Sequence, residues 1–172
     1  AGRLYADANA MAALALQRAA AAGEGAAYGQ AADEALAALR ERFYDPMLGM
    51  IHRRAPDGEL VYGLLGDAAA AALAFTEAFL RSGHKPHREF ADQLMQWLFQ
   101  ELWDRDRGGF HDGVPRADNV GLLREPRAGG WADQAAAFEA LWRLHHLKGS
   151  ANYKRWLDWG LGAVQPPAEA PG

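Results

Sequence analysis

The chain has 172 residues, half of them hydrophobic, a formal net charge of −4 and no cysteine. This length and hydrophobicity fit one folded domain with a substantial core and exclude an intrinsically disordered chain. The absence of cysteine excludes disulfides, thiolate metal sites and cysteine nucleophiles, and it fits a reducing cytoplasm, so we expect a cytoplasmic protein. The mildly acidic balance, without a basic stripe, argues against nucleic acid as a partner.

Three segments are predicted to be buried helices. They cover residues 7–22, 64–81 and 132–147 and are rich in alanine and leucine. Each is followed by a glycine suited to the left-handed end of a helix. These glycines, at positions 23, 83 and 149, are 60 (83 − 23) and 66 (149 − 83) residues apart. Apolar residues surround each segment almost completely, which is typical of helices buried on more than one side.

Each buried segment is followed by an amphipathic one. Residues 28–43, 87–103 and 153–164 carry apolar side chains at the i, i+3, i+4 and i+7 spacing of a helix with one buried face. In the first of them, for example, this stripe contains Leu36, Leu39 and Phe43. The alternation predicts three successive α-hairpins, each with a buried inner helix and an amphipathic outer helix.

A second repeat lies between the hairpins. Residues 43–52 and 102–111 both read apolar, aromatic, Asp, three variable residues, Gly, one variable residue, apolar and His, with a period of 59 (104 − 45). The aspartates of this connector follow a helix, where a carboxylate can accept the amides of a turn. Gly49 and Gly108 are predicted to need a positive φ.

The two connectors lead into different segments. In the first, residues 49–53 and 59–62 flank an Asp-Gly turn at 57–58 and predict a short β-hairpin. The second has six additional residues (66 − 60), which we place within 111–130. A loop of this length is either functional or a tolerated insertion at one rim. Residues 165–172 are rich in proline and alanine and are predicted to form a flexible C-terminal tail.

Together these elements predict an all-α fold over residues 1–164. Three αα-hairpins in series form a curved array, or half of an (α/α)6 toroid with short β-hairpin connectors. A half-toroid should expose an apolar inner face, which predicts a homodimer or a missing half-barrel from the parent chain. The chain begins with Ala1 and lacks a signal-peptide pattern, so we expect a fragment of a longer protein. No stretch of the sequence is apolar for long enough to span a membrane, and we expect no membrane partner.

Four stretches of the chain resemble, in their order and spacing, the motifs of a known family. They are Asp7-Ala-Asn9-Ala-Met, Gly63-Leu-Leu-Gly-Asp67, Leu102-Trp-Asp104 with Gly108-Gly-Phe110, and Leu122-Leu-Arg124-Glu-Pro126 with Ala132-Asp133-Gln-Ala. They are similar to the α/α-barrel region of thioredoxin-domain-containing proteins of the spermatogenesis-associated type. The resemblance implies the C-terminal half of that barrel. It also implies a fold related to six-hairpin glycosidases and N-acylglucosamine 2-epimerases, which act on sugars at the inner-helix end.

The chain also departs from the family pattern. Ala8 and Ala10 stand where the family has Trp before, and Gly after, the asparagine of its first motif. Ala132 and Asp133, with Trp131 ahead of them, replace a Ser-Gly-Asn run. These changes fall where a sugar site would lie, so they weaken the transfer of an activity to this chain.

Asn9, Asp67 and Asp133 stand near the starts of the three inner helices, which would converge at one rim of a toroid. We predict that Asp67 and Asp133 are catalytic residues, because paired carboxylates can perform general acid–base chemistry, and that Asn9 binds substrate. The alternative is helix capping, since Asp and Asn favour helix N-termini. Glu77 and Glu139 lie further along the same helices and either face the cavity or are ion-paired or solvated.

Trp131 and Arg124 complete the predicted substrate-binding set. Trp131 follows two glycines at the end of the long loop, where an exposed indole can stack on a sugar ring. Arg124 belongs to the family-like run in that loop. Of the other tryptophans, one belongs to the second connector and is predicted to pack between hairpins, and the rest are predicted to be core residues: Trp97, Trp142, Trp156 and Trp159.

No metal site and no cofactor is predicted. His52 and His111 recur with the connector, which favours a structural role, and no zinc, phosphate-loop or nucleophile-elbow motif is found. Two functions stay open. One is an α/α-barrel segment that binds or acts on carbohydrate, with a sugar as its ligand. The other is a non-catalytic helical scaffold or accessory domain of a thioredoxin-domain protein.

Overall fold

The computed structural model describes residues 4–23, 25–55, 58–115 and 127–163. Within them lie six α-helices and three short strands. In chain order these are α1 (Ala6–Ala21), α2 (Ala26–Phe43), β1 (Tyr44–Asp45), β2 (Gly49–Arg54), β3 (Leu60–Tyr62), α3 (Leu65–Ser82), α4 (Lys85–Glu101), α5 (Trp131–Lys148) and α6 (Ala151–Ala163). All six predicted helices are confirmed, and each boundary lies within two residues of its predicted position. None of the helices in the described part of the chain has the length and hydropathy that a membrane crossing requires.

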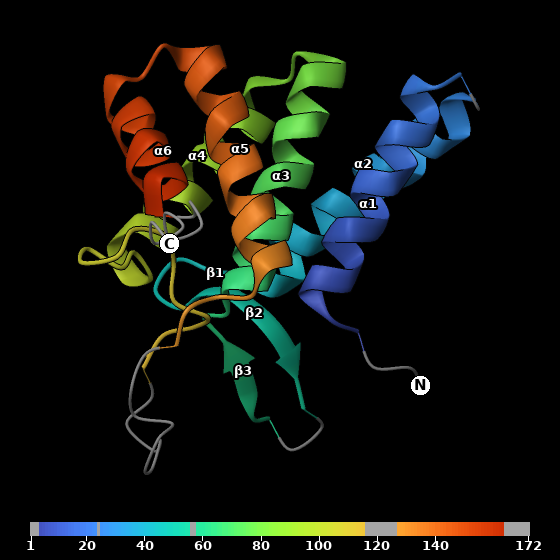
Figure 1. Cartoon of the computed structure of the whole chain (residues 1–172). Coiled ribbons are helices and arrows are strands. Elements are labelled where there is room, and N and C mark those ends of the chain that lie inside the picture. Colours follow the sequence, from blue (N-terminus) through green and yellow to red (C-terminus); the bar gives the residue numbers. More distant parts are fainter. Residues whose placement is uncertain (1–3, 24, 56–57, 116–126, 164–172) are drawn as a thin grey trace, which may run out of the picture.

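The helices form three antiparallel hairpins that stand side by side. The inner helices α1, α3 and α5 all begin at the end of the molecule that carries the small sheet (Figure 1). The central inner helix α3 packs against α1 on one side and α5 on the other, and α4 packs against it as its hairpin partner. This arrangement confirms the predicted all-α fold of three hairpins.

The burial of the inner helices follows their place in the array. In α3 every residue from Ala68 to Thr76 is buried, because neighbouring helices cover it on several sides. Its run of five alanines lets those helices approach closely. Helices α1 and α5, at the two ends of the row of inner helices, are less buried than predicted. Met11 on α1 is 52% exposed and Trp142 on α5 is 53% exposed. Each of them has an inner-helix neighbour on one side only in the described structure.

The burial of the tryptophans also depends on the position of their hairpin in the row. Trp97 is buried, Trp156 stacks on Phe99 with ring centroids 3.8 Å apart, and Trp103 packs in the same aromatic cluster, as predicted. The prediction is wrong for Trp142 and Trp159, which are 53% and 42% exposed. Both lie on the last hairpin, where no further hairpin covers them in the described structure.

The connector repeat is confirmed at the level of hydrogen bonds. The Asp45 Oδ1 atom accepts the amides of the second and third residues after it, at 2.8 and 3.0 Å. Asp104 Oδ1 accepts the equivalent amides at 2.9 and 3.0 Å, which lowers the pKa of its carboxyl group. Gly49 and Gly108 have φ values of 76° and 75°, as predicted. The same turn therefore follows both α2 and α4.

The predicted β-hairpin is also confirmed, with one irregularity. Strand β2 pairs antiparallel with β1 and with β3. Ile51 is opposite Tyr62 and Arg53 is opposite Val61, so His52 is an extra residue in a β-bulge. A bulge breaks the regular alternation of a strand and can redirect a side chain. This bulge sits beside the start of the inner helices.

The long second connector is described only at its two ends. His111 forms an isolated bridge with Ala128. The side chain of Gln134 on α5 holds the backbone of Phe110 through two hydrogen bonds, of 3.1 and 2.6 Å. Arg124 and the predicted C-terminal tail, 165–172, lie outside the described residues.

Candidate functional site

Three aspartates occupy equivalent positions at the starts of the inner helices. Asp7, Asp67 and Asp133 each precede the glycine that ends their hairpin's first helix by 16 residues (23 − 7, 83 − 67 and 149 − 133). The prediction from sequence chose Asn9 in place of Asp7. Asn9 lies two residues further on, and its side chain donates a 2.6 Å hydrogen bond to the carbonyl of Tyr5. The constant interval to the glycine is the signal that identifies Asp7.

Asp67 is the buried centre of this group. Its side chain is 1% exposed, its Oδ1 atom accepts the backbone amide of Asp7 at 3.0 Å, and the same oxygen lies 2.9 Å from His52 Nδ1. Asp67 therefore accepts an amide at the start of the neighbouring helix α1. The alternative prediction, that Asp67 caps its own helix, is wrong for this residue, because α3 has no side-chain cap hydrogen bond. Burial raises the pKa of Asp67 to about 6, against the opposing effect of the His52 hydrogen bond.

His52 links the sheet to the inner helices. The bulge in β2 places its ring 5.0 Å from the ring of Tyr5, and its Nδ1 atom lies 3.8 Å from Asp7 Oδ1. With the proton on Nδ1, the imidazole donates to Asp67, and this fixes the orientation of the ring. The predicted structural role of His52 in the turn is thus joined by a second one, as a member of the aspartate cluster.

Asp133 approaches the same cluster from α5. Its Oδ1 atom lies only 3.0 Å from the point that a Cβ atom on Gly66 would occupy, so the glycine before Asp67 makes room for it. Burial and the charge of Asp7 both raise the pKa of Asp133. The structure therefore places Asp133 against the glycine that precedes Asp67, the other carboxylate that the sequence predicts to be catalytic, and adds Asp7, whose charge acts on both.

A groove of about 340 Å³ runs between the three inner helices. Asp7, Gly66 and Asp133 line it at the sheet end, Arg18 and Glu139 line it further along, and its remaining walls are apolar, formed by Met11, Leu14, Ala70, Leu73, Ala132, Ala135 and Ala136. Asp67 is not among the lining residues. Trp131, the first residue of α5, is 75% exposed and lies two positions before Asp133.

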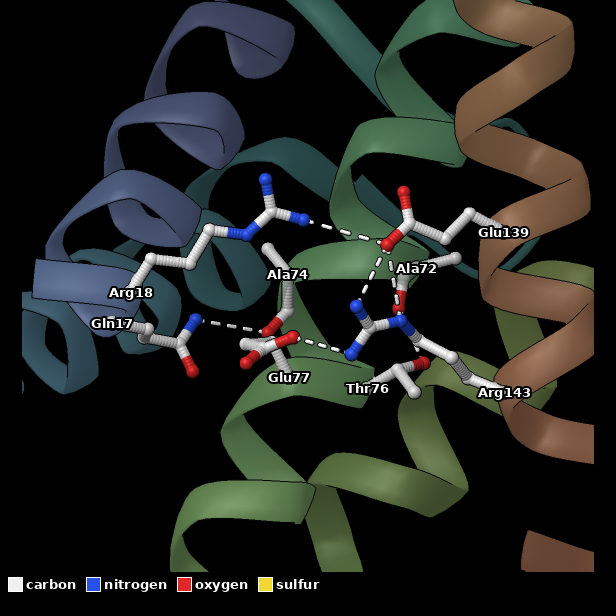
Figure 2. Close-up of polar contacts among 8 residues, drawn as sticks. All are labelled: Gln17, Arg18, Ala72, Ala74, Thr76, Glu77, Glu139 and Arg143. Atoms are coloured by element: carbon white, nitrogen blue, oxygen red, sulfur yellow. Dashed lines mark hydrogen bonds and ion pairs between the residues drawn. The ribbon is translucent and has the colours of Figure 1, made fainter. Parts of the chain in front are cut away.

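An ion-pair network crosses the inner helices at the other end of this groove and includes two of its lining residues, Arg18 and Glu139. Figure 2 shows Arg143 of α5 between Glu77 of α3 and Glu139 of its own helix, at 2.6 and 2.7 Å. Arg18 of α1 reaches Glu139 at 3.4 Å. The predicted ion-paired position of Glu77 and Glu139 is confirmed. The inner face is consequently not uniformly apolar, because charges compensate one another along its middle.

The cluster at the sheet end has the groups required for hydrogen bonding to hydroxyls and for proton transfer. Asp7 and Asp133 line the groove. Next to them, burial raises the pKa of Asp67 to about 6, and its Oδ1 atom lies 2.9 Å from the His52 imidazole. Carboxyl groups with raised pKa values in a cleft are typical of sites that bind or transform a ligand.

Comparison with known proteins gives the fold. Neither protein-family models nor curated protein sequences match the chain. Among solved structures, an α-1,6-mannanase of glycoside hydrolase family 76 from Salegentibacter sp., an inactive variant in complex with α-1,6-mannotriose, has a TM-score of 0.80 and 14% identity over 99% of this chain and 50% of its own. Cellobiose 2-epimerase from Spirochaeta thermophila has a TM-score of 0.74 and 19% identity over 92% of this chain and 42% of its own.

The fold is that of six-hairpin glycosidase-like proteins. A family 76 glycoside hydrolase from a Bacteroides thetaiotaomicron strain has the same arrangement, with a TM-score of 0.80 and 12% identity over 94% of this chain and 35% of its own. The chain spans half or less of the length of these six-hairpin proteins. The matches show the α/α-barrel fold and do not extend to a thioredoxin-domain family.

The aspartates of the mannanase variant differ in spacing from those of this chain. In the inactive variant two consecutive aspartates are replaced. This chain contains no two consecutive aspartates. Its own acidic groups come instead from three separate helices, and a histidine from the sheet joins them.

Proposed function

We propose that this chain is the carbohydrate-binding part of an α/α barrel and that neutral sugars bind in the groove between α1, α3 and α5. The observation that carries this proposal is the convergence of Asp7 and Asp133 at one end of the groove, over the buried pair of Asp67 and His52. The α/α-barrel fold, shared with carbohydrate-acting enzymes, supports it.

The charges of the groove favour neutral over anionic sugars. Three of its lining residues are acidic, Asp7, Asp133 and Glu139, and one is basic, Arg18. Glu139 and Arg18 already pair with each other, which leaves the two aspartates as acceptors. Carboxylates accept hydrogen bonds from sugar hydroxyls, whereas they repel a uronate or a sugar phosphate. The apolar walls can pack against the carbon-bound hydrogens of a sugar ring.

Trp131 supplies the stacking surface. Its indole is 75% exposed at the start of α5, and Asp133 follows on the same first turn. Trp131 is not a lining residue of the groove, and we propose that its indole covers the ring face of a ligand that extends beyond Asp133. We therefore assign Trp131 and Asp133 to the same sugar-binding position.

The proposal concerns binding by this chain and extends to catalysis only for a completed barrel. Three further hairpins, from the parent chain or from a second copy, would close the groove opposite α3. We do not propose mannanase activity, because the chain spans only half of the mannanase's length and is 14% identical to it. The second candidate is a non-catalytic helical scaffold or accessory domain, which predicts no sugar binding.

Isothermal titration with α-1,6-mannotriose, mannose, cellobiose and glucuronate in metal-free buffer tests the proposal. We expect millimolar binding of at least one neutral sugar and none of glucuronate. Trp131→Ala should weaken binding by about 3- to 10-fold, the magnitude of one aromatic contact. Trp142→Ala is the matched control. Trp142 is similarly exposed on the same helix, 11 residues (142 − 131) and roughly 16 Å away at the helical rise.

The outcomes separate the two candidate functions. No heat of binding at tens of millimolar sugar favours the scaffold. Equal losses in the two tryptophan variants place any sugar outside the proposed groove. A further variant, Asp133→Asn, keeps the size of the side chain but removes its charge, and should weaken binding without changing the fold.

A further inference from the structure

The cluster beneath the sugar groove also has the composition of a metal site. We propose that Asp7, His52 and Asp67 bind one divalent cation of the Zn²⁺ or Mn²⁺ class. This inference goes beyond the proposed function and does not depend on it. The sequence predicts no metal, because these three ligands come from α1, β2 and α3 and form no spacing motif.

The geometry fits a single ion. One ligand atom from each residue, a carboxylate oxygen or an imidazole nitrogen, lies within 4.8 Å of the other two. Bonds from such atoms to a divalent metal are ~2.0–2.4 Å long. Two ligands of one ion are therefore at most ~4–4.8 Å apart, so an ion between these three atoms can contact all of them with small side-chain adjustments.

A second observation points to a missing cation. The carboxyl group of Asp67 is 1% exposed and directed into the cluster through Oδ1, while its Oδ2 atom has no hydrogen-bond partner within the described residues. Buried polar atoms are rarely left unpaired, and an unpaired one in a native structure often marks an unseen ion or water. In the described part of the chain, no lysine or arginine forms an ion pair with Asp7, Asp67 or Asp133.

The donor set selects the class of metal. Two carboxylate oxygens and one imidazole nitrogen suit Zn²⁺ and Mn²⁺, whereas Ca²⁺ and Mg²⁺ favour oxygen ligands alone. On binding, the cation replaces the hydrogen bond that now joins His52 Nδ1 and Asp67 Oδ1 at 2.9 Å. Three protein ligands leave coordination positions open, and Asp7 lines the groove, so water or a ligand hydroxyl can reach the ion.

Calorimetric titration of EDTA-treated protein with ZnCl2 or MnCl2 alone, without any sugar, tests the proposal. We expect one ion per chain. At 100 times its dissociation constant, the ion should raise Tm by about 5–10 °C for a domain of this size. Asp67→Asn, His52→Gln and Asp7→Asn should each weaken binding by about tenfold or more. Asp7 is partly exposed, so its variant keeps the proposal testable if a buried change impairs folding.

Two matched controls distinguish this site from its neighbours. Asp158→Asn removes an exposed carboxylate of α6 outside the cluster and should leave the affinity unchanged. His146→Gln removes an exposed histidine beside another histidine on α5, where surface binding of Zn²⁺ would occur. Absence of binding at millimolar metal would overturn the proposal. Affinity that survives Asp67→Asn and His52→Gln, or that is lost in His146→Gln, would overturn it equally. A negative sugar titration leaves this result unaffected.

Discussion

Replacing Asp67 with asparagine should make this protein more stable at neutral pH. Asp67 is buried against His52 and the backbone amide of Asp7, and burial raises its pKa to about 6 from an ordinary 3.8. A carboxyl group whose pKa is raised in the folded state binds its proton more tightly there than in the unfolded chain. Its contribution to stability is therefore complete below pH 3.8 and is lost as the pH rises through about 6.

The magnitude follows from the two pKa values. Each tenfold difference in proton affinity corresponds to about 1.4 kcal/mol, so the difference between 3.8 and about 6 corresponds to roughly 3 kcal/mol. Asparagine resembles the protonated side chain in shape and can still accept the amide of Asp7 and the Nδ1–H of His52. Asp67→Asn should match the parent near pH 3.5 and exceed it by roughly 3 kcal/mol at pH 7.5.

Urea unfolding of both proteins between pH 3.5 and 8 in EDTA gives this difference directly, because other titrating groups cancel in the comparison. EDTA is required because a bound cation would offset the same negative charge. Asp104→Asn is the control with opposite sign: turn amides lower the pKa of Asp104, so its contribution to stability is present above the unfolded pKa and lost as the pH falls. Parallel pH profiles for Asp67→Asn and its parent would falsify the raised pKa.

Two further pairs of substitutions test the scaffold through its stability in urea. Gly49 has a φ of 76°, and a Cβ atom there would lie 2.5 Å from the Trp97 ring, so Gly49→Ala should cost about 2–4 kcal/mol. Gly58 has a φ of 89°, but a Cβ atom there would meet no atom within 4 Å, so Gly58→Ala should cost about 1 kcal/mol. Equal costs for the two alanine substitutions would contradict the packing argument. Arg143→Met leaves a partly buried carboxylate on α3 unpaired and should cost about 1–3 kcal/mol. The same change at Arg18, whose side chain is 53% exposed, should cost less than about 0.5 kcal/mol, and a reversed order would show that the network does not stabilise the inner face.

The sequence predicts the parts of this fold that depend on local periodicity. Apolar spacing and the glycine stops determine the helices, and the repeated connector predicts the turns at Asp45 and Asp104, because each of these features lies within a short stretch of chain. The same periodicity contains Asp7, at the constant interval of 16 residues from the glycine.

The parts that the sequence does not predict depend on contacts between distant elements. His52 joins the aspartates only because β2 bulges against β3, and Asp67 caps α1 only because α1 and α3 pack side by side. The exposure of Trp142 and Trp159 likewise depends on which hairpins are present to cover the last one. None of these contacts has a signature in the spacing of residues along the chain.

The most direct test of the proposed sugar site is an ¹H–¹⁵N NMR titration of the isotope-labelled protein with α-1,6-mannotriose and with cellobiose. We predict saturable shifts of the amides of Asp7, Gly66 and Asp133 and of the Trp131 indole N–H. Signals of the outer helices α2 and α4 should remain unchanged. Shifts confined to the outer helices, or no shifts at tens of millimolar sugar, would contradict the claim that carbohydrate binds between the inner helices.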